Sequence, residues 1–393
     1  MVALPSATVD FELSDEQRAV RDLCREFARE EVAPRAAHYD QTEEFPYELV
    51  EGMARLGLFG LPFAESVGGA GGDFLSYCLA LEEIARADAS VAITLEASVS
   101  LGIAPLVEFG TPEQRERWLA PLLAGERLWA FGLTEPEAGS DAAATRTRAV
   151  RDGDEWVING TKCFITNAGT DISAGVTITA TTGADLHGNR RISAIAVERG
   201  TPGYSQAPKY RKLGWHASDT RELRFEDCRV PAGNLIGIEG AGFRQFLQIL
   251  EAGRVALAAL SVGVAQACLD ASLSHAAQRR QFGQPIARFQ AIQFKLADMA
   301  TQVELARLAT WRAAAAIDTT GRAGVYASMA KLHASETATA CANHAVQIHG
   351  GYGFMEELPV ARYYRDVKVN EIGEGTSEVQ RILIARHLLE GLE

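Results

Sequence analysis

The chain changes character twice, and the order of its segments limits the folds open to it. Residues 1–127 carry helical spacing, residues 128–236 are rich in β-branched and aromatic runs, and residues 237–393 return to long helical patterns. This order indicates a β lobe inserted between helical lobes. Because 393 residues are too many for one ordinary core, we expect a mainly α fold of three domains with these boundaries.

Helix signals are clear in the N-terminal third. Ser14 opens a capping box, and the pattern after it predicts a helix to about Val32, ending before Pro34. A second capping box begins at Thr111. Residues 75–87 between them have helical apolar spacing. We therefore expect the first domain to consist of helices and loops.

Turn and strand signals fill the middle third. An Asp-Gly pair at 152–153 and an Asn-Gly pair at 159–160 are typical hairpin turns. Further runs with strand character are residues 176–182, 192–197 and 223–230. Short strands separated by such turns predict a small β-barrel or sandwich.

Long helical patterns return in the last third. They cover residues 243–274, 290–319 and 325–349. Residues 255–269 are apolar almost all round, which indicates a helix buried in a bundle, and the stretch is short for a membrane span. We expect a four-helix-bundle-like domain.

Composition narrows the classes of function. Apolar residues make up 47% and charged residues 23%, as in folded globular proteins. A net charge of −13 argues against nucleic acid or an anionic membrane as main partner. Six dispersed cysteines indicate buried free thiols in a reducing compartment. Residues 1–12 show no secretory signal pattern, so we expect a cytoplasmic protein.

One acid near the C-terminus lies between two glycines. Residues 370–378 read NEIGEGTSE, with Glu374 as that acid. A carboxylate on such a loop can approach a ligand while its own N–H stays free to donate, which suits proton removal beside a carbonyl. The alternative is a plain connection between helices, with Thr376 or Ser377 as N-cap.

Other motifs admit both a binding and a structural interpretation. Residues 132–141 form a loop of hydroxyls and small residues able to approach a planar ligand, or an ordinary turn. Residues 347–354 expose glycine N–H groups for a phosphate, or merely end a helix. Residues 279–283 are a diphosphate clamp or a solvated turn. Arg254 either pairs with a carboxylate such as Glu374 or extends to solvent.

Several common chemistries lack their sequence signals. His344 and His349 are five residues apart, which is wrong for two ligands on one helical face, so we expect no metal site. The sequence has no G-x-S-x-G motif, which disfavours a serine hydrolase. The glycine-rich loop at residues 68–72 lacks dinucleotide-fingerprint spacing.

Together these motifs resemble those of the acyl-CoA dehydrogenase family, and the match covers nearly the whole chain. Residues 132–144 and 347–366 fit the two family signatures throughout. The second signature includes Gly350, Gly351, Gly353, Glu357, Arg362 and Asp366. With residues 279–283 and 374–377 in order as well, the resemblance is very specific.

The resemblance implies FAD held between the β lobe and the C-terminal helices, in a homotetramer of paired dimers. The implied flavin contacts are Phe131, Leu133, Thr134, Gly139, Ser140, Phe164, Ile165, Thr166, Gln290, Thr376 and Glu378. Those expected to reach the FAD of a neighbouring subunit are Arg279, Gln281 and Phe282, joined by Gln347, Gly350 and Gly351. Phe164 stands where the family usually has tryptophan, so an aromatic wall remains without the indole donor.

The resemblance also implies the reaction. Glu374 matches the base of the straight-chain members, which removes the pro-R α-proton of a fatty acyl-CoA while the β-carbon passes hydride to flavin N5. The product is the trans-2-enoyl thioester, and an electron-transfer flavoprotein takes the electrons. The implied substrate contacts are Ser140, Arg254, Glu374 and Gly375, with the Glu374 N–H and a ribityl hydroxyl polarising the carbonyl. Burial should raise the pKa of Glu374.

Two glycines bear on the substrate. Isovaleryl-type members place their base at the position of Gly253, so this residue argues against an isovaleryl substrate. Gly373 stands where many relatives have tyrosine, which leaves room beside the acyl chain. We therefore predict short-to-medium or modestly branched chains.

Two alternatives keep the same fold. An oxygen-using acyl-CoA oxidase or flavin monooxygenase is one, and Glu374 and the chain length disfavour it. A non-catalytic, DNA-binding flavoprotein is the other, and the acidic balance and the intact base disfavour it.

Overall fold

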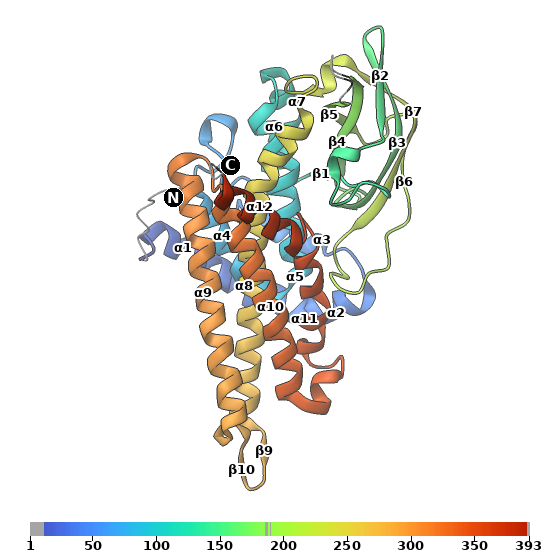
Figure 1. Ribbon diagram of the computed structural model, residues 1–393. Coiled ribbons are helices and arrows are strands. Elements are labelled where there is room, and N and C mark those ends of the chain that lie inside the picture. Colours follow the sequence, from blue (N-terminus) through green and yellow to red (C-terminus); the bar gives the residue numbers. More distant parts are fainter. Residues whose placement is uncertain (1–11, 185–187, 189, 391–393) are drawn as a thin grey trace.

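Helices make up most of the chain, and the strands of the main sheet gather at one end of the longest helices, as the computed structural model shows (Figure 1). The structure describes residues 12–184, 188 and 190–390. The segment expected to lack a secretory signal lies almost wholly outside the described residues. The helices of the first third are α1 (Asp15–Phe27), α2 (Ala33–Thr42), α3 (Tyr47–Arg55), α4 (Phe74–Ala87), α5 (Ala89–Glu96), α6 (Ala104–Phe109) and α7 (Pro112–Leu123).

Local signals place these helices. Ser14 and Thr111 both form the predicted capping boxes, each accepting a backbone N–H and receiving a side-chain bond in return. Asp73 caps α4 by accepting from the Ser76 N–H at 2.6 Å. The prediction that the first helix ends before Pro34 is wrong. A π-helical turn, η1 (Ala28–Val32), leads directly into α2, so the helical backbone continues past Pro34 without a break.

The strands form one mixed sheet with β1 paired to its middle. The strands are β1 (Leu128–Gly132), β2 (Arg148–Asp152), β3 (Glu155–Thr166), β4 (Ser173–Ala184), β5 (Arg190–Glu198), β6 (Tyr204–Gln206), β7 (Thr220–Pro231) and β8 (Leu235–Ile236). Their order is β6-β7-β3-β2-β4-β5-β8, and β1 runs parallel to β4. The β lobe predicted between two helical lobes is confirmed.

One turn prediction in this lobe is wrong. The Asn-Gly pair at 159–160 lies inside β3, at a register shift against β7. Gly160 has φ of 154°, and a Cβ there would lie 2.4 Å from Thr147 Oγ1, so the glycine allows close approach of β3 and the segment that leads into β2.

Long helices follow the sheet. They are α8 (Gly242–Gln278), α9 (Gln290–Thr320), α10 (Val325–His349), α11 (Pro359–Asp366) and α12 (Ser377–Leu389). A short hairpin of β9 (Arg280–Gln281) and β10 (Gln284–Pro285) joins α8 to α9 at the end remote from the β lobe (Figure 1). The helix predicted at 325–349 is confirmed at both ends.

Helices from both ends of the chain share one hydrophobic core. Side chains of α1, α4 and α5 pack in the same cluster as those of α8, α9 and α10, while the β lobe has a separate core. Two segments, Ala89–Phe109 and Gly242–Gln278, are long and apolar enough to span a membrane, but 83% of each window is buried in the structure, as in core helices.

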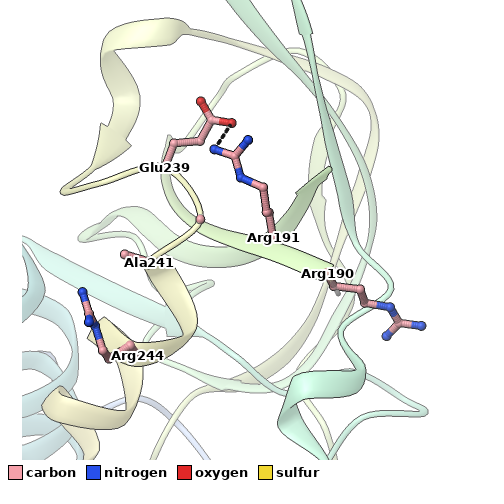
Figure 2. Close-up of a pocket in the computed structure, with 6 residues that line it drawn as sticks. Arg190, Arg191, Glu239, Ala241 and Arg244 are labelled. Atoms are coloured by element: carbon pink, nitrogen blue, oxygen red, sulfur yellow. Dashed lines mark ion pairs between the residues drawn. The ribbon is translucent and has the colours of Figure 1, made fainter. Parts of the chain in front are cut away.

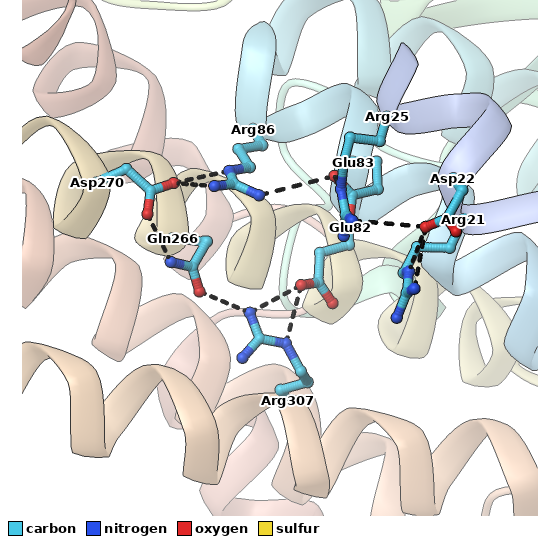
Figure 3. Close-up of polar contacts among 9 residues, drawn as sticks. All are labelled: Arg21, Asp22, Arg25, Glu82, Glu83, Arg86, Gln266, Asp270 and Arg307. Atoms are coloured by element: carbon cyan, nitrogen blue, oxygen red, sulfur yellow. Dashed lines mark hydrogen bonds and ion pairs between the residues drawn. The ribbon is translucent and has the colours of Figure 1, made fainter. Parts of the chain in front are cut away.

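A chain of polar contacts crosses this helical core (Figure 3). Arg307 of α9 pairs with Glu82 of α4 at 2.8 Å and with Gln266 of α8 at 2.8 Å. The next link joins Arg86 of α4 to Asp270 of α8 at 2.5 Å. These contacts join α4 to α8 and α9, two helices that lie more than 150 residues after it in the sequence.

Candidate functional site

The loop between η8 (Val367–Glu371) and α12 carries an acid in an unusual backbone conformation. Glu374 has φ of 55° and Gly375 has φ of 95°, so two consecutive residues occupy the left-handed region. Glycine tolerates this region, whereas a residue with a side chain pays about 1–2 kcal/mol. Thr376 then caps α12, accepting from the Val379 N–H at 3.3 Å. The expected helix cap is present, but it does not explain the strain at Glu374.

Donors from three helices hold this loop by its backbone oxygens. Arg254 Nε donates to the backbone carbonyl oxygen of Glu374 at 3.3 Å, and Lys331 Nζ donates to that of Gly375 at 2.8 Å. Gln380 Nε2 reaches both oxygens, at 3.3 Å and 2.8 Å. The loop is therefore positioned by the packing of α8, α10 and α12.

The Glu374 side chain lies against Gly253 of α8. A Cβ at position 253 would stand 2.5 Å from Glu374 Oε2 and 3.2 Å from a methyl group of Leu101. This oxygen is buried and accepts no N–H or hydroxyl hydrogen bond from the described residues. Burial raises the pKa of Glu374 to about 7, although Lys331 and Arg254 oppose the rise. A carboxylate with these properties is suited to accept a proton near neutral pH.

A second buried carboxyl faces Glu374. Glu96, the last residue of α5, is fully buried. Burial and the negative charge of Glu374 raise the pKa of Glu96 well above its ordinary value of 4.5. The pair therefore keeps its proton on Glu96, and Glu374 ionises first. Tyr77 of α4 lies close to both acids, with its hydroxyl 3.2 Å from Ser100 Oγ.

Sequence analysis did not single out Glu96, Tyr77 or Lys331. A signal existed for two of them: Glu96 follows the mostly apolar run 91–95, and Lys331 follows the run 327–330 in a buried helix face. Lone charges at such positions usually have a partner or a function. Their partner lies in the loop of Glu374, which spacing along the chain does not reveal.

The loop after β1 is fixed by a buried ion pair. Lys162 is fully buried, with Nζ 2.7 Å from Glu135 Oε1 and 3.1 Å from the Leu133 carbonyl oxygen. Glu135 also accepts hydrogen bonds from two backbone N–H groups. The loop thus presents the exposed residues Gly139 and Ser140 from a rigid base.

Phenylalanines give the neighbouring surface an aromatic character. Phe131 stacks on Phe246 of α8, with ring centroids 4.0 Å apart. Phe164 lies at an irregularity of β3 with φ of 61°, and it is 66% exposed. The side chain of Ile165 is buried in the β-lobe core, so only its backbone is available to a ligand, and Thr166 is half-buried.

Several of the remaining predicted residues gather at the far end of α8, whereas Thr376 and Glu378 lie at the start of α12, beside Glu374. A cavity of about 470 Å³ at the far end of α8 is lined by Arg279, Gln281, Gly350 and Gly351, among others. The hairpin residue Phe282 is 93% exposed. Guanidinium and glycine N–H groups around one cavity are donors that suit a diphosphate.

One chain does not bring its two groups of predicted flavin contacts together. Gly253 lies in the first third of α8, beside Glu374, whereas Arg279 follows the last residue of this helix. At 37 residues α8 is about 55 Å long. Both groups fit parts of FAD, because one offers an exposed ring and hydroxyls and the other offers donors for a diphosphate. They cannot surround the same part of one ligand within a single chain.

A basic pocket that the sequence analysis missed lies between β5 and the start of α8. It encloses about 470 Å³ and is lined by Arg190, Arg191, Glu239 and Arg244, among others. Figure 2 shows Arg191 paired with Glu239 at 3.1 Å, above the first turn of α8 from which Arg244 projects. The Arg190 guanidinium points away from these residues and donates to the Thr145 carbonyl oxygen at 3.3 Å. Arg191 and Arg244 against one carboxylate still leave the pocket with surplus positive charge suited to phosphate groups.

Family models and known proteins match this chain over almost its full length. Residues 14–126, 130–228 and 240–389 match the N-terminal, middle and C-terminal domains of acyl-CoA dehydrogenases. A probable acyl-CoA dehydrogenase of Bacillus subtilis (strain 168) is 52% identical over 97% of this chain and 100% of its own. The mitochondrial short-chain specific acyl-CoA dehydrogenase of Bos taurus is 45% identical over 96% of this chain and 91% of its own. The structure of butyryl-CoA dehydrogenase from Megasphaera elsdenii superposes with a TM-score of 0.93 at 43% identity, covering 97% of this chain and 100% of that one.

Proposed function

Because this chain belongs to the acyl-CoA dehydrogenase family, we propose that Glu374 is the base with which it oxidises a short acyl-CoA thioester. The enzyme is an FAD-dependent oxidoreductase that introduces a trans-2 double bond into its substrate. The observation that carries the assignment of Glu374 is its buried carboxylate, which lies on a strained loop, has one oxygen to which no N–H or hydroxyl group of the described residues donates, and has a pKa near neutrality.

Glu374, Arg254 and Gln380 have separate roles in the proposed reaction. Glu374 Oε2 receives the α-proton, because it is buried and no N–H or hydroxyl group of the described residues donates to it. Bound FAD supplies the hydride acceptor. The Arg254 and Gln380 bonds to the Glu374 carbonyl oxygen keep the base loop fixed, so that its N–H groups are held in place for a thioester carbonyl.

Replacement of Glu374 tests this assignment. The variant Glu374→Gln should retain yellow flavin and lose about 10²–10⁴-fold in the rate of flavin bleaching by acyl-CoA under anaerobic conditions. The matched control is Glu371→Gln, three residues earlier, whose carboxylate pairs with Lys368 at 2.5 Å. This control should bleach near the wild-type rate. A Glu374→Gln variant that bleaches normally would exclude Glu374 as the base.

We propose short-to-medium acyl chains as substrates. The relatives named for short-chain and butyryl substrates support this proposal. Gly373 supports it too, because a Cβ there would meet only the Val369 carbonyl oxygen, at 3.5 Å, which leaves space beside the base. Bleaching rates across butyryl-, octanoyl- and palmitoyl-CoA test it, and a maximum at palmitoyl-CoA would contradict it.

The basic pocket supports a nucleotide-bearing thioester. Arg191 and Arg244 lie where β5 meets α8, on the helix that also carries Gly253 beside the base. We propose that they bind phosphate groups of CoA. The other predicted substrate and cofactor contacts, in the β-lobe loop and the hairpin, remain part of this proposal.

We further propose a homotetramer in the cytoplasm that passes electrons to an electron-transfer flavoprotein. The separation of the two groups of flavin contacts along α8 supports assembly, because a neighbouring subunit supplies the hairpin group. The exposed ring of Phe282 on that hairpin supports it as well. The six cysteines are all buried and unpaired, which fits a reducing compartment.

The oxidase alternative is not favoured by the three relatives described above, which are named as dehydrogenases or a probable dehydrogenase. Peroxide release measured against reduction of an artificial electron acceptor distinguishes the two.

A further inference from the structure

Lys331 is a buried cation in the helical core. Its side chain is fully buried in α10, and its Nζ donates to the Gly375 carbonyl oxygen at 2.8 Å. It forms no salt bridge with any carboxylate in the described part of the chain, unlike the buried Lys162, whose partner is Glu135 at 2.7 Å. A buried ammonium without a paired carboxylate is costly, so it calls for a compensating charge nearby.

The acid that acts most strongly on Lys331 is Glu374. Burial lowers the pKa of Lys331 to about 8, and the negative charge of Glu374 opposes this most. Weaker opposition comes from Glu371 and Glu378, while Arg254 adds to the lowering. The Lys331 ammonium thus donates a hydrogen bond to the carbonyl oxygen of Gly375, the residue after the base. It is also the positive charge that acts most strongly on the Glu374 carboxylate.

We propose that Lys331 is a positioning residue of the reaction: it holds the base loop at Gly375 and serves as the counter-charge that keeps Glu374 ionised before proton transfer. This proposal rests on the proposed role of Glu374. It adds a function for a residue of α10, whose ammonium bonds the peptide that follows the base.

The structure separates the two parts of this role. Gln380 donates to the same Gly375 oxygen at 2.8 Å but carries no charge. Loss of Gln380 therefore removes a loop anchor alone, whereas loss of Lys331 removes an anchor and a positive charge. The other charged or titratable groups that act electrostatically on Glu374 or Lys331 are unchanged in both variants. These groups are Arg254 of α8, Glu96 of α5, Tyr77 of α4, Glu371 and Glu378.

The test is the pH dependence of flavin bleaching in the holoenzyme with butyryl-CoA. At low pH the bleaching rate falls because Glu374 becomes protonated. This falling part of the pH–rate profile is its acid limb. In Lys331→Met the acid limb should move up by about 1 unit or more, the effect of removing a neighbouring opposite charge. At a pH below the limb, bleaching should then be about 10-fold slower than in the wild type.

The variant Gln380→Leu is the matched control. It should slow bleaching at every pH without moving the acid limb. If Lys331→Met is folded and yellow but keeps the wild-type limb, or if Gln380→Leu moves the limb equally, the counter-charge role is wrong. If the methionine variant does not fold, Lys331→Gln, which is polar and uncharged, takes its place under the same criterion. Failure of the base assignment itself looks different, since Glu374→Gln would then bleach normally.

Discussion

At the scale of single residues, the site is a balance of charges around one carboxylate. Glu374 is flanked by the cations Lys331 and Arg254 and by the acid Glu96. The cations lower its pKa, and burial raises it. A neutral Glu96 adds no repulsion, which is why the protonation of Glu96 matters for catalysis.

We predict that Glu96→Gln leaves the acid limb of bleaching where it is in the wild type. The substitution exchanges a neutral acid for a neutral amide of the same size, because the pKa of Glu96 lies well above its ordinary value. The pH profile of the reductive half-reaction provides the measurement. A downward movement of the limb would show that Glu96 carries a negative charge that the variant has lost.

These residues also show how far the site follows from sequence. The glycines that flank Glu374 indicate a loop that could present a base, and its φ of 55° agrees with a special loop, but only the resemblance to a family singles out this acid as the base. Lys331 and Glu96 have no local motif, and only the packing of α5, α8 and α10 brings them to the loop. A sequence therefore predicts local backbone conformation, such as a glycine-flanked loop. It does not predict which side chains from distant helices will contact that loop.

At the scale of elements, boundaries with strong local chemistry were predictable. The capping boxes at Ser14 and Thr111 and the helix Val325–His349 were predicted and are confirmed. The prediction of a turn at the Asn-Gly pair 159–160 was wrong because this pair is compatible both with a turn and with a close contact inside a strand. Tertiary packing decides between the two. The interlocking of α4, α8 and α9 by polar contacts had no sequence signal.

We expect Arg307→Met to destabilise the protein by about 3 kcal/mol, because it leaves the largely buried Glu82 without its partner. Thermal unfolding of the holoenzyme measures the effect. The double variant Glu82→Gln, Arg307→Met should recover part of the loss, since no unpaired charge remains. A double variant less stable than Arg307→Met would contradict this account of the pair.

At the scale of the whole molecule, three segments meet at one ion cluster. Asp40 lies in α2, His216 in the connection from β6 to β7, and Arg365 in α11. The His216 Nδ1 is 3.0 Å from Asp40 Oδ1, and Arg365 also pairs with Asp40. The cluster thereby ties the N-terminal helices, the β lobe and the C-terminal helices together.

This junction should make stability depend on pH. Hydrogen bonding to Asp40 raises the pKa of His216 to about 9 in the folded protein, against about 6.5 in an unfolded chain. Its contribution is therefore complete below about pH 6.5 and is lost as the pH rises through about 9. We predict that His216→Gln lowers the melting temperature most at pH 6, by an amount equivalent to about 2 kcal/mol.

The same variant supplies the comparison at high pH. At pH 10 the melting temperatures of wild type and His216→Gln should differ much less, because the wild-type imidazole is then neutral. An undiminished difference at pH 10 would show that charge does not matter at this junction.

The missing side chain at position 253 restricts how this enzyme can diverge. Since any β-carbon there would press on Glu374 Oε2 at 2.5 Å, helix and loop compete for one small volume. A side chain at position 253 can therefore be accommodated only if the Glu374 carboxylate turns away from the helix. A relative that carried an acid on the helix at this position would fill the volume that the loop acid occupies here, so the two positions exclude each other as seats for one proposed base.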